Sequence, residues 1–170
     1  MKSYSNRSLL IDSINQTITE IEVPKANEAW HIHNLIYCEC FSEVKLGSGI
    51  SLLVDDEGLY RIKRQANPPH DVSQGFFVTH SQGVPRHLIA GKGLISAYNS
   101  KGETIDLPAW VTPTLIQRHI KFVADEHRNA AAELCAEILA RVGVTANPAE
   151  FEEHDRRYAE IVRRAMALTI

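Results

Sequence analysis

Val54-Asp55-Asp56-Glu57-Gly58-Leu59 is the stretch of this sequence that decides the expected fold. It follows the apolar run Ser51-Leu52-Leu53 and leads into Tyr60-Arg61-Ile62, so two strand-like runs flank an acidic turn. Aspartate accepts hydrogen bonds from turn N–H groups and glycine supplies a positive φ, which are the properties that a tight turn requires. The stretch therefore predicts a β-hairpin with strands at 50–55 and 59–63.

Similar patterns recur along the N-terminal two thirds of the chain. Short runs rich in β-branched and aromatic residues alternate with segments of Gly, Asn, Pro and Ser, which is typical of antiparallel strands joined by turns. Gly91 and Gly93 interrupt one of these runs and indicate a bulge or a close backbone approach. Strands are expected at 9–12, 17–23, 37–46, 50–55, 59–63, 75–79, 87–98 and 103–105, with turns at 13–16, 47–49, 67–69 and 99–102.

One short helix is expected within this part of the chain. Pro24 suits the first turn of a helix, and the pattern extends to about Leu35. Ala26 and Trp30 fall on what would be the apolar side of that helix.

The hydrophobic period changes after residue 112. Thr112 can cap a helix that has Pro113 at its first position, and an apolar stripe from Ile116 to Val142 advances in steps of three or four. Asn147-Pro148 then resembles the start of a second helix that runs to the C-terminus. The expected fold class is α+β: a bent antiparallel sheet or small barrel with one short helix at 8–106, followed by a helical hairpin at 112–170.

Composition restricts the partners that the protein can have. The chain has 170 residues, 44% of them hydrophobic and 23% charged, and a net charge of −3. This balance disfavours nucleic acid and anionic membranes as partners. No apolar run approaches the roughly 20 residues of a membrane span, and no signal-peptide core is evident. Three cysteines cannot form a closed disulfide framework, so a cytoplasmic location is expected.

Several of these segments, taken in their order and spacing, resemble a known domain family. They are Leu10-Ile11-Asp12, 17–23, Ile36-Tyr37-Cys38, 54–59, Phe76-Phe77, Pro85 and 88–95. The sequence is similar to a family of unknown function that is encoded on phages, plasmids and bacterial chromosomes. The resemblance implies a mobile-element or bacterial cytoplasmic context, and it supplies no activity, cofactor or catalytic residue. The loop at 65–74 and the region after Thr112 depart from the family pattern.

Two groups of residues invite a metal-site interpretation. His31, His33, Cys38 and Cys40 have the donor atoms that zinc prefers, but their spacing does not direct all four to one point on a helix or a strand. The carboxylates of 55–57 lack the alternating spacing of a calcium loop and fit a turn better. The sequence therefore predicts no metal and no cofactor.

Basic residues suggest a binding surface around the loop at 67–74. Arg61 and Lys63 would share a strand face, and Phe76 lies where an aromatic ring can stack on a base. Charges on exposed strand faces are common, however, and one of two consecutive Phe residues must point into the core. The candidate binding residues are Arg61, Lys63, Arg64, His70, Phe76, Arg86, His87 and Lys92.

A hydrolase is the second alternative. His70, His80 and His87 are candidate bases, with Asp71, Ser73 and Ser81 nearby in sequence. No nucleophile elbow, phosphate-binding loop or paired-carboxylate pattern accompanies them, so no catalytic residue is assigned.

The sequence as a whole favours a non-enzymatic protein that binds another protein or a small ligand. The apolar stripes of the C-terminal helices predict a homo-oligomer formed through those helices. Single-stranded nucleic-acid binding through Arg61, Lys63 and Arg64, and hydrolysis through His70, His80 and His87, remain the alternatives.

Overall fold

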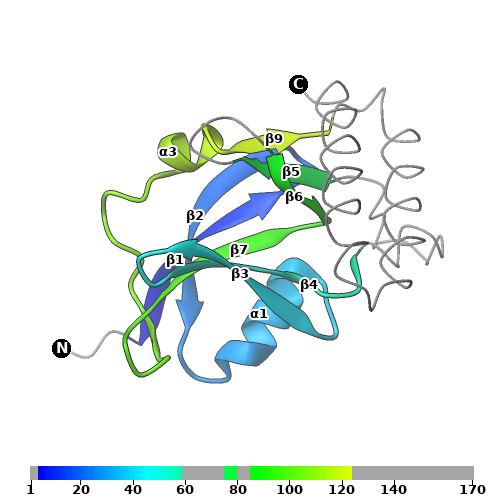
Figure 1. Cartoon of the computed structure of the whole chain (residues 1–170). Coiled ribbons are helices and arrows are strands. Elements are labelled where there is room, and N and C mark those ends of the chain that lie inside the picture. The colour runs from blue at the N-terminus through cyan, green and yellow to red at the C-terminus, as the bar shows by residue number, and fades with distance from the viewer. Residues whose placement is uncertain (1–3, 59–74, 80–84, 124–170) are drawn as a thin grey trace, which may run out of the picture.

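Two antiparallel sheets form the part of the chain that this computed structural model describes, which is residues 4–58, 75–79 and 85–123 (Figure 1). The larger sheet has the strand order β2-β1-β7-β4-β3, and the short β8 pairs with the end of β7. The smaller sheet has the order β6-β5-β9. The strands are β1 (Ser5–Asp12), β2 (Thr17–Pro24), β3 (Phe41–Gly47), β4 (Ile50–Asp55), β5 (Gly75–Thr79), β6 (Pro85–Ala90), β7 (Gly93–Tyr98), β8 (Thr104–Ile105) and β9 (Ile120–Phe122).

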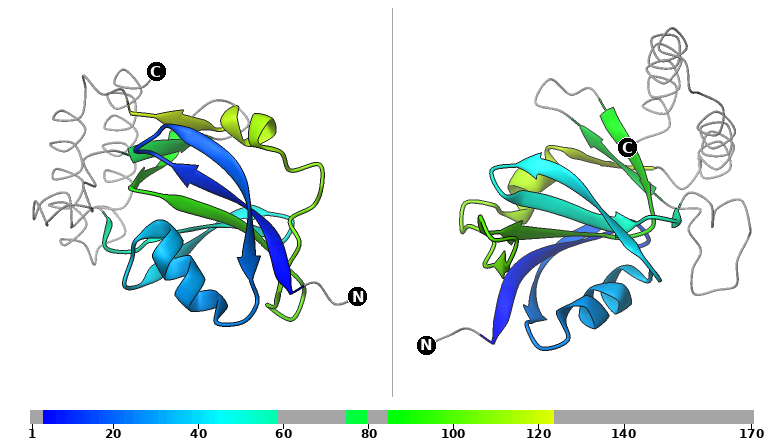
Figure 2. Two further views of the ribbon diagram at one scale, coloured as in Figure 1. Left: turned by 180° about the vertical axis from the view of Figure 1, so that it is seen from behind. Right: turned by 60° about the horizontal axis from the view of Figure 1, so that its bottom comes forward.

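Two helices in the described residues lie on opposite faces of the larger sheet (Figure 2). Helix α1 (Glu28–Ile36) covers one face, and α3 (Pro113–Gln117) lies with the smaller sheet over the other. The α+β class and the mainly antiparallel sheet are confirmed. The barrel alternative is wrong, because the larger sheet is open, with β2 and β3 at its ends in the described strand order.

Alternation along the strands divides the core into two clusters. Leu9 and Ile11 of β1 face the smaller sheet, whereas Leu10 packs with the cluster beneath α1. Strand β4 is buried at all six positions, because it lies inside the sheet and both of its faces are covered. This explains why Leu52, Leu53 and Val54 are consecutive apolar residues and do not alternate with polar ones.

The acidic stretch after β4 does not form the predicted hairpin. Strand β4 pairs with β3 along one edge and with β7 along the other, so it has no free edge for a strand at 59–63. The true hairpin partner is β3, through the predicted turn at 47–49. Residues 59–63 lie outside the described residues.

The turn chemistry at this stretch is correspondingly different. Asp55 Oδ1 accepts a hydrogen bond from the Glu57 N–H at 3.1 Å, as expected of a turn aspartate. Gly58, however, is not among the glycines with positive φ. A Cβ at Gly58 would lie 3.2 Å from the Ala90 carbonyl oxygen, so the glycine serves a close approach of the chain to β6.

The expected strand at 87–98 is two strands in different sheets. Gly91, with a φ of 78°, separates β6 from β7. The predicted close approach is confirmed at Gly93, where a Cβ would lie 2.7 Å from Leu52 Cδ1 and 3.0 Å from Phe76 Cζ. A side chain at this position would push apart the two layers, and this explains why the chain crosses between the sheets at glycines.

The long helix predicted from residue 112 is wrong over its first part. Thr112 does cap a helix, since its Oγ1 accepts from the Leu115 N–H at 3.2 Å, but α3 ends at Gln117. Residues 120–122 then pair with β5 as β9. Ile120 and Phe122 are buried and alternate with exposed Lys121, as in a strand, whereas the predicted helical stripe ran through Ile120 and Val123. Residues 124–170, which carry the rest of the predicted hairpin, lie outside the described residues.

The N-terminal helix is shifted from its predicted position. Pro24 ends β2, and α1 begins at Glu28, after Asn27 in a left-handed conformation. The helix buries Ile32 and Ile36, whereas Trp30 is 62% exposed. Tyr37, expected in a strand, is the left-handed C-cap of this helix.

Candidate functional site: an apolar pocket between the two sheets

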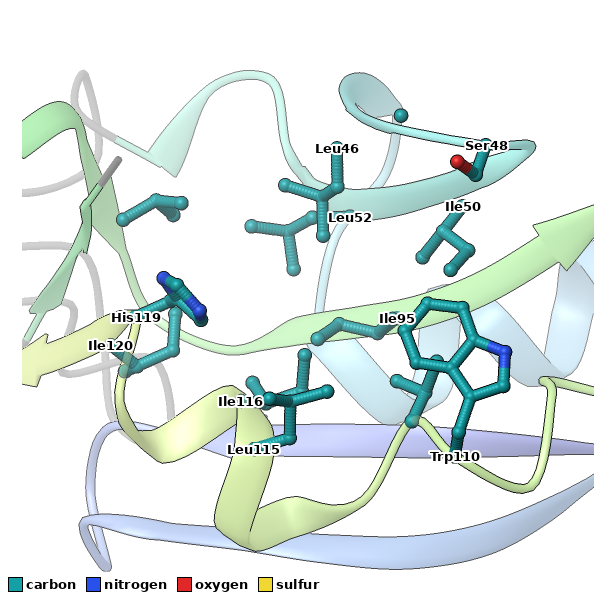
Figure 3. A pocket seen from close by; sticks show the side chains of 13 residues that line it. Leu46, Ser48, Ile50, Leu52, Ile95, Trp110, Leu115, Ile116, His119 and Ile120 are labelled. Atoms are coloured by element: carbon teal, nitrogen blue, oxygen red, sulfur yellow. The ribbon is translucent and has the colours of Figure 1, made fainter. Parts of the chain in front are cut away.

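A pocket of about 340 Å³ lies between the larger sheet and the segment that carries α3 and β9 (Figure 3). One wall comes from β3, β4 and β7, and the opposite wall comes from residues 110–120 and from β5. Most of the lining side chains are aliphatic. The described lining residues are Leu46, Gly47, Ser48, Ile50, Leu52, Val78, Ile95, Trp110, Val111, Leu115, Ile116, His119 and Ile120.

The alternation of the sheet builds the first wall. Ile50 and Leu52 of β4 and Ile95 of β7 point to the side of the sheet that faces the smaller sheet, and all three belong to its core cluster. Their neighbours Leu53 and Leu94 point to the α1 side. The strands thus present a continuous aliphatic floor to the pocket.

The second wall is less completely packed. Leu115 and Ile116 of α3 line the pocket and are only partly buried, and α3 has no fully buried residue. Trp110 is 61% exposed and lies with Ser48 near Ile50, whereas His119 lies beside Ile120 (Figure 3). The polar groups of Ser48 and His119 are therefore placed at opposite ends of an apolar space.

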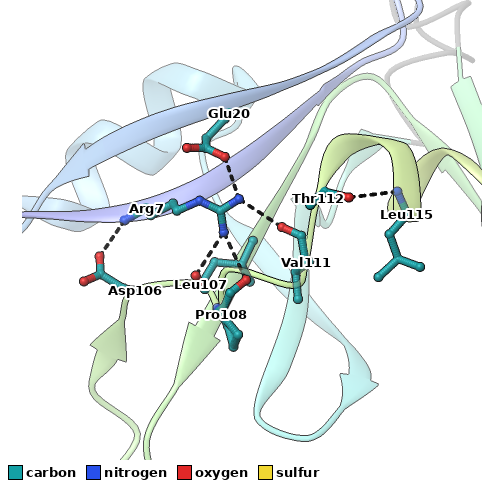
Figure 4. A network of polar contacts seen from close by, with 8 residues as sticks. All are labelled: Arg7, Glu20, Asp106, Leu107, Pro108, Val111, Thr112 and Leu115. Atoms are coloured by element: carbon teal, nitrogen blue, oxygen red, sulfur yellow. Dashed lines mark hydrogen bonds and ion pairs between the residues drawn. The ribbon is translucent and has the colours of Figure 1, made fainter.

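Arg7 holds the chain segment that carries Trp110 and Val111 (Figure 4). Its Nη1 donates to the carbonyl oxygens of Leu107 at 3.0 Å and Pro108 at 3.1 Å, and its Nη2 donates to that of Val111 at 3.0 Å. Five donors in a planar fork make arginine suited to binding several carbonyl groups at once. This cluster of contacts is called the Arg7 clamp below.

Charged neighbours complete the Arg7 clamp. Glu20 accepts from Arg7 Nη2 at 2.5 Å, and Asp106 Oδ1 accepts from the Arg7 backbone N–H at 2.9 Å. The hydrogen bond to Glu20 is the main cause of a raised pKa for Arg7, and the same contact lowers the pKa of Glu20. Both groups are therefore charged at neutral pH, and the clamp keeps its ion pair.

Of the predicted binding residues, Phe76 is placed in the core. It is 0% exposed and packs edge-on against Phe122, with ring centroids 6.4 Å apart. A buried ring cannot stack on a nucleic-acid base, so the assignment of Phe76 to a binding surface is wrong.

Lys92 is also tied to the protein itself. Its Nζ lies 2.8 Å from Asp12 Oδ2 and 4.7 Å from the centroid of the Tyr37 ring. Burial tends to raise the pKa of Asp12, but hydrogen bonds from Lys92 and Asn15 outweigh it and leave this pKa lowered. Lys92 is therefore part of an ion pair at the C-terminal end of α1 and does not contribute a free charge to a basic surface.

The other candidates fall partly or wholly outside the described residues. Arg86 and His87 lie on β6, and nothing is described of their side chains. The remaining basic and histidine candidates, Arg61, Lys63, Arg64, His70 and His80, lie outside the described ranges. The nucleic-acid and hydrolase alternatives at these residues stay predictions.

The histidine and cysteine group near α1 has a local contact. His33 Nδ1 lies 3.1 Å from the Cys38 carbonyl oxygen and 3.6 Å from Cys38 Sγ. Within residues 4–58, 75–79 and 85–123, no three His, Cys, Asp or Glu side chains are grouped so that they could hold a metal ion. The helices of this part of the chain also include none long and apolar enough to cross a membrane.

A more open hollow of about 590 Å³ lies beside the N-terminal end of α1 and includes Glu28, Phe41, Tyr98 and Thr104. Two of its polar groups bond each other, through the 2.6 Å hydrogen bond from Thr104 Oγ1 to Glu28 Oε2. Burial, together with the nearby carboxylates, raises the pKa of Tyr98 to about 12. The pocket between the sheets is more enclosed than this hollow and has a mainly aliphatic lining, so the pocket is the stronger candidate site.

The fold and site define an α+β protein with two antiparallel sheets and an apolar pocket between them. Comparisons of the chain with known protein families, with curated proteins and with solved structures each find no match. The resemblance to a phage, plasmid and bacterial family therefore stays a prediction, and the function is argued from the pocket itself.

Sequence reasoning did not identify the pocket. Most of its second wall comes from residues 110–120, most of which were expected to begin a long helix. One signal was available: Leu107-Pro108-Ala109-Trp110-Val111 is an apolar segment that a proline and its neighbours keep out of regular structure. Such a segment has to pack against something, here the first wall of the pocket and Arg7.

Proposed function

We propose that this protein is a non-enzymatic binding protein that takes a small, mainly apolar molecule into the pocket between its two sheets. The observation that carries the proposal is the pocket itself, because close-packed interiors seldom contain voids larger than a water molecule. Its volume of about 340 Å³ falls in the range of roughly 300–1,000 Å³ that is typical of small-molecule sites. An aliphatic lining with few polar groups is also typical of such sites.

The arrangement of polar groups favours binding over catalysis at this place. A nucleophile and its base must lie within hydrogen-bond reach, roughly 2.6–3.2 Å apart. Ser48 and His119 are at opposite ends of the pocket (Figure 3). No other described lining residue supplies a histidine, carboxylate, thiol or amine.

The cellular context and assembly belong to the same proposal. The family resemblance supports a bacterial, mobile-element origin and a cytoplasmic location. Residues 113–122 contribute to the described core, so we assign the predicted self-association to residues 124–170. A protein partner would then bind through that region and not through the pocket.

The binding proposal can be tested with N-phenyl-1-naphthylamine, a neutral apolar dye that fluoresces strongly when it leaves water. When the dye itself is excited, its fluorescence should show saturable binding to the full chain, with one site per chain. Ile116→Trp should lower its affinity at least about tenfold, because the larger side chain fills the pocket.

Thr114→Trp is the matched control for this experiment. Thr114 is on the same helix but is exposed and does not line the pocket, so the dye should bind this variant as it binds the unchanged protein. Absence of saturable binding to the unchanged protein, or an equal loss of affinity in the two variants, would contradict the proposal.

A further inference from the structure

We propose that the molecule bound in this pocket is an alkyl monocarboxylate, with its carboxylate at His119 and its chain running towards Trp110. The inference rests on the proposed function, since it names the chemical class of ligand for the same pocket. It is carried by the distribution of charge around the pocket and by the position of its polar groups.

The two ends of the pocket differ in charge. His119 is the only titratable residue among the described lining residues, and the exposed residues Arg118 and Lys121, which do not line the pocket, lie close to it in sequence. No aspartate or glutamate is found among those lining residues. The group at the other end, Ser48, is neutral. Among the described lining residues, the group that can attract an anionic head group is therefore His119.

The His119 ring is available for such a contact. Its backbone N–H bonds to the Ile116 carbonyl oxygen at 2.8 Å, which fixes the residue at the end of α3. No hydrogen bond joins its ring to another residue within the described part of the chain, and the residue is only half-buried. A carboxylate bound there would form a charge-assisted hydrogen bond with the imidazolium.

The space between the two ends suits an alkyl chain. Leu52, Ile95 and Ile116 line it, and none of these side chains can donate or accept a hydrogen bond. A ligand with polar groups along its length would leave those groups unpaired, which costs binding energy. A single polar end with a flexible apolar tail matches both the walls and the charge.

Displacement of N-phenyl-1-naphthylamine distinguishes this class from neutral ligands. Octanoate, decanoate and dodecanoate are compared with the corresponding alcohols, all below their micelle concentrations. The titrations are made at pH 5.8, on the acidic side of the range in which histidines change charge. The carboxylates should displace the dye at concentrations about fivefold lower than the alcohols, the size expected of one partly exposed charge interaction.

Two variants assign the preference to one side chain. His119→Gln keeps a hydrogen-bonding group but removes the charge, so it should bind acids and alcohols about equally while still binding the dye. Arg118→Gln removes the adjacent exposed charge and should keep most of the preference for the acid.

The outcomes separate this inference from the proposed function. If the dye binds but acids and alcohols compete equally, or neither competes, the ligand class is wrong and the binding function stands. If Arg118→Gln abolishes the preference as completely as His119→Gln, the assignment to His119 is wrong. If the dye does not bind the unchanged protein, the proposed function itself fails.

Discussion

The two faces of the larger sheet are covered by helices of different length. On one face, the nine residues of α1 bury Ile32 and Ile36 against Val23, Leu53 and Leu94. On the other, the five residues of α3 bury no side chain completely. The first face is closed by packed side chains beneath α1, with an open hollow of about 590 Å³ at the N-terminal end of the helix, whereas the second face retains a more enclosed pocket of about 340 Å³.

The difference shows how a fold can leave room for a ligand without a defect in its sheet. Strands β4 and β7 supply buried apolar side chains to both faces. What differs is the cover, since α3 is too short to fill the space above Leu52 and Ile95. The Arg7 clamp holds the segment before α3 in place by hydrogen bonds, whereas α1 is held by buried side chains.

The largest expected effect comes from weakening the closed face. Ile32→Ala removes a fully buried side chain from beneath α1 and should lower the free energy of unfolding by about 3 kcal/mol. Denaturant unfolding followed by circular dichroism measures this loss. A loss below about 1 kcal/mol would mean that the face is not closely packed.

A somewhat smaller loss is expected from the Arg7 clamp. Arg7→Lys keeps the positive charge but cannot bind three carbonyl groups with one planar fork, so the variant should lose about 2 kcal/mol of stability. Binding of N-phenyl-1-naphthylamine should weaken as well, because Trp110 and Val111 lose their support. A variant with unchanged stability and dye affinity would show that the clamp does not position the pocket wall.

The pocket face should tolerate truncation much better than the closed face. Ile116→Ala enlarges a space that already exists, so its cost in stability should stay below about 1.5 kcal/mol, near the cost of the smallest core truncations. The same unfolding experiment, run beside Ile32→Ala, compares the two faces directly. Equal losses in the two variants would remove the distinction between them.

The smallest effect concerns the Asp12–Lys92 pair at the edge of the closed face. Because the folded pKa of Asp12 is lowered, its ionised form contributes stability above the unfolded pKa of about 3.9. That contribution is lost as the pH falls through the folded pKa. The stability difference between the unchanged protein and Asp12→Asn should thus be constant near neutral pH and shrink below about pH 4. A stability difference between the two proteins that grows as the pH falls would contradict this prediction.

The elements predicted correctly from the sequence are those set by local chemistry. The β1–β2 hairpin, the turn at 47–49 and the strand at 75–79 all follow from alternation and turn residues within a few positions. The Asn99–Gly102 turn is another example, because Asn99 accepts from the Glu103 N–H and Gly102 has a φ of 79°. Such contacts are encoded by neighbouring residues.

The errors arose where distant parts of the chain decide the structure. The pairing of β4 with β7 removes the edge that a strand at 59–63 would need, and nothing in the acidic turn reveals this. Ile116, Ile120 and Val123 have the spacing of a helical stripe, but residues 120–122 pair with the edge of β5 and form a strand. The pocket combines β3, β4 and β7 with residues 110–120, and none of the eight predicted binding residues is among its described lining residues.

Contact quenching of the two tryptophans tests the central claim most directly. The chain has two tryptophans, of which Trp110 lines the pocket and Trp30 is on the exposed side of α1. In Trp30→Phe, 1-bromopentane should quench the remaining Trp110 along a saturable curve, because the bromine atom quenches only on contact and the pocket can be filled. In Trp110→Phe, the remaining Trp30 should show only the linear quenching of random collisions. Linear quenching of equal slope in both variants would contradict a ligand-binding pocket between the two sheets.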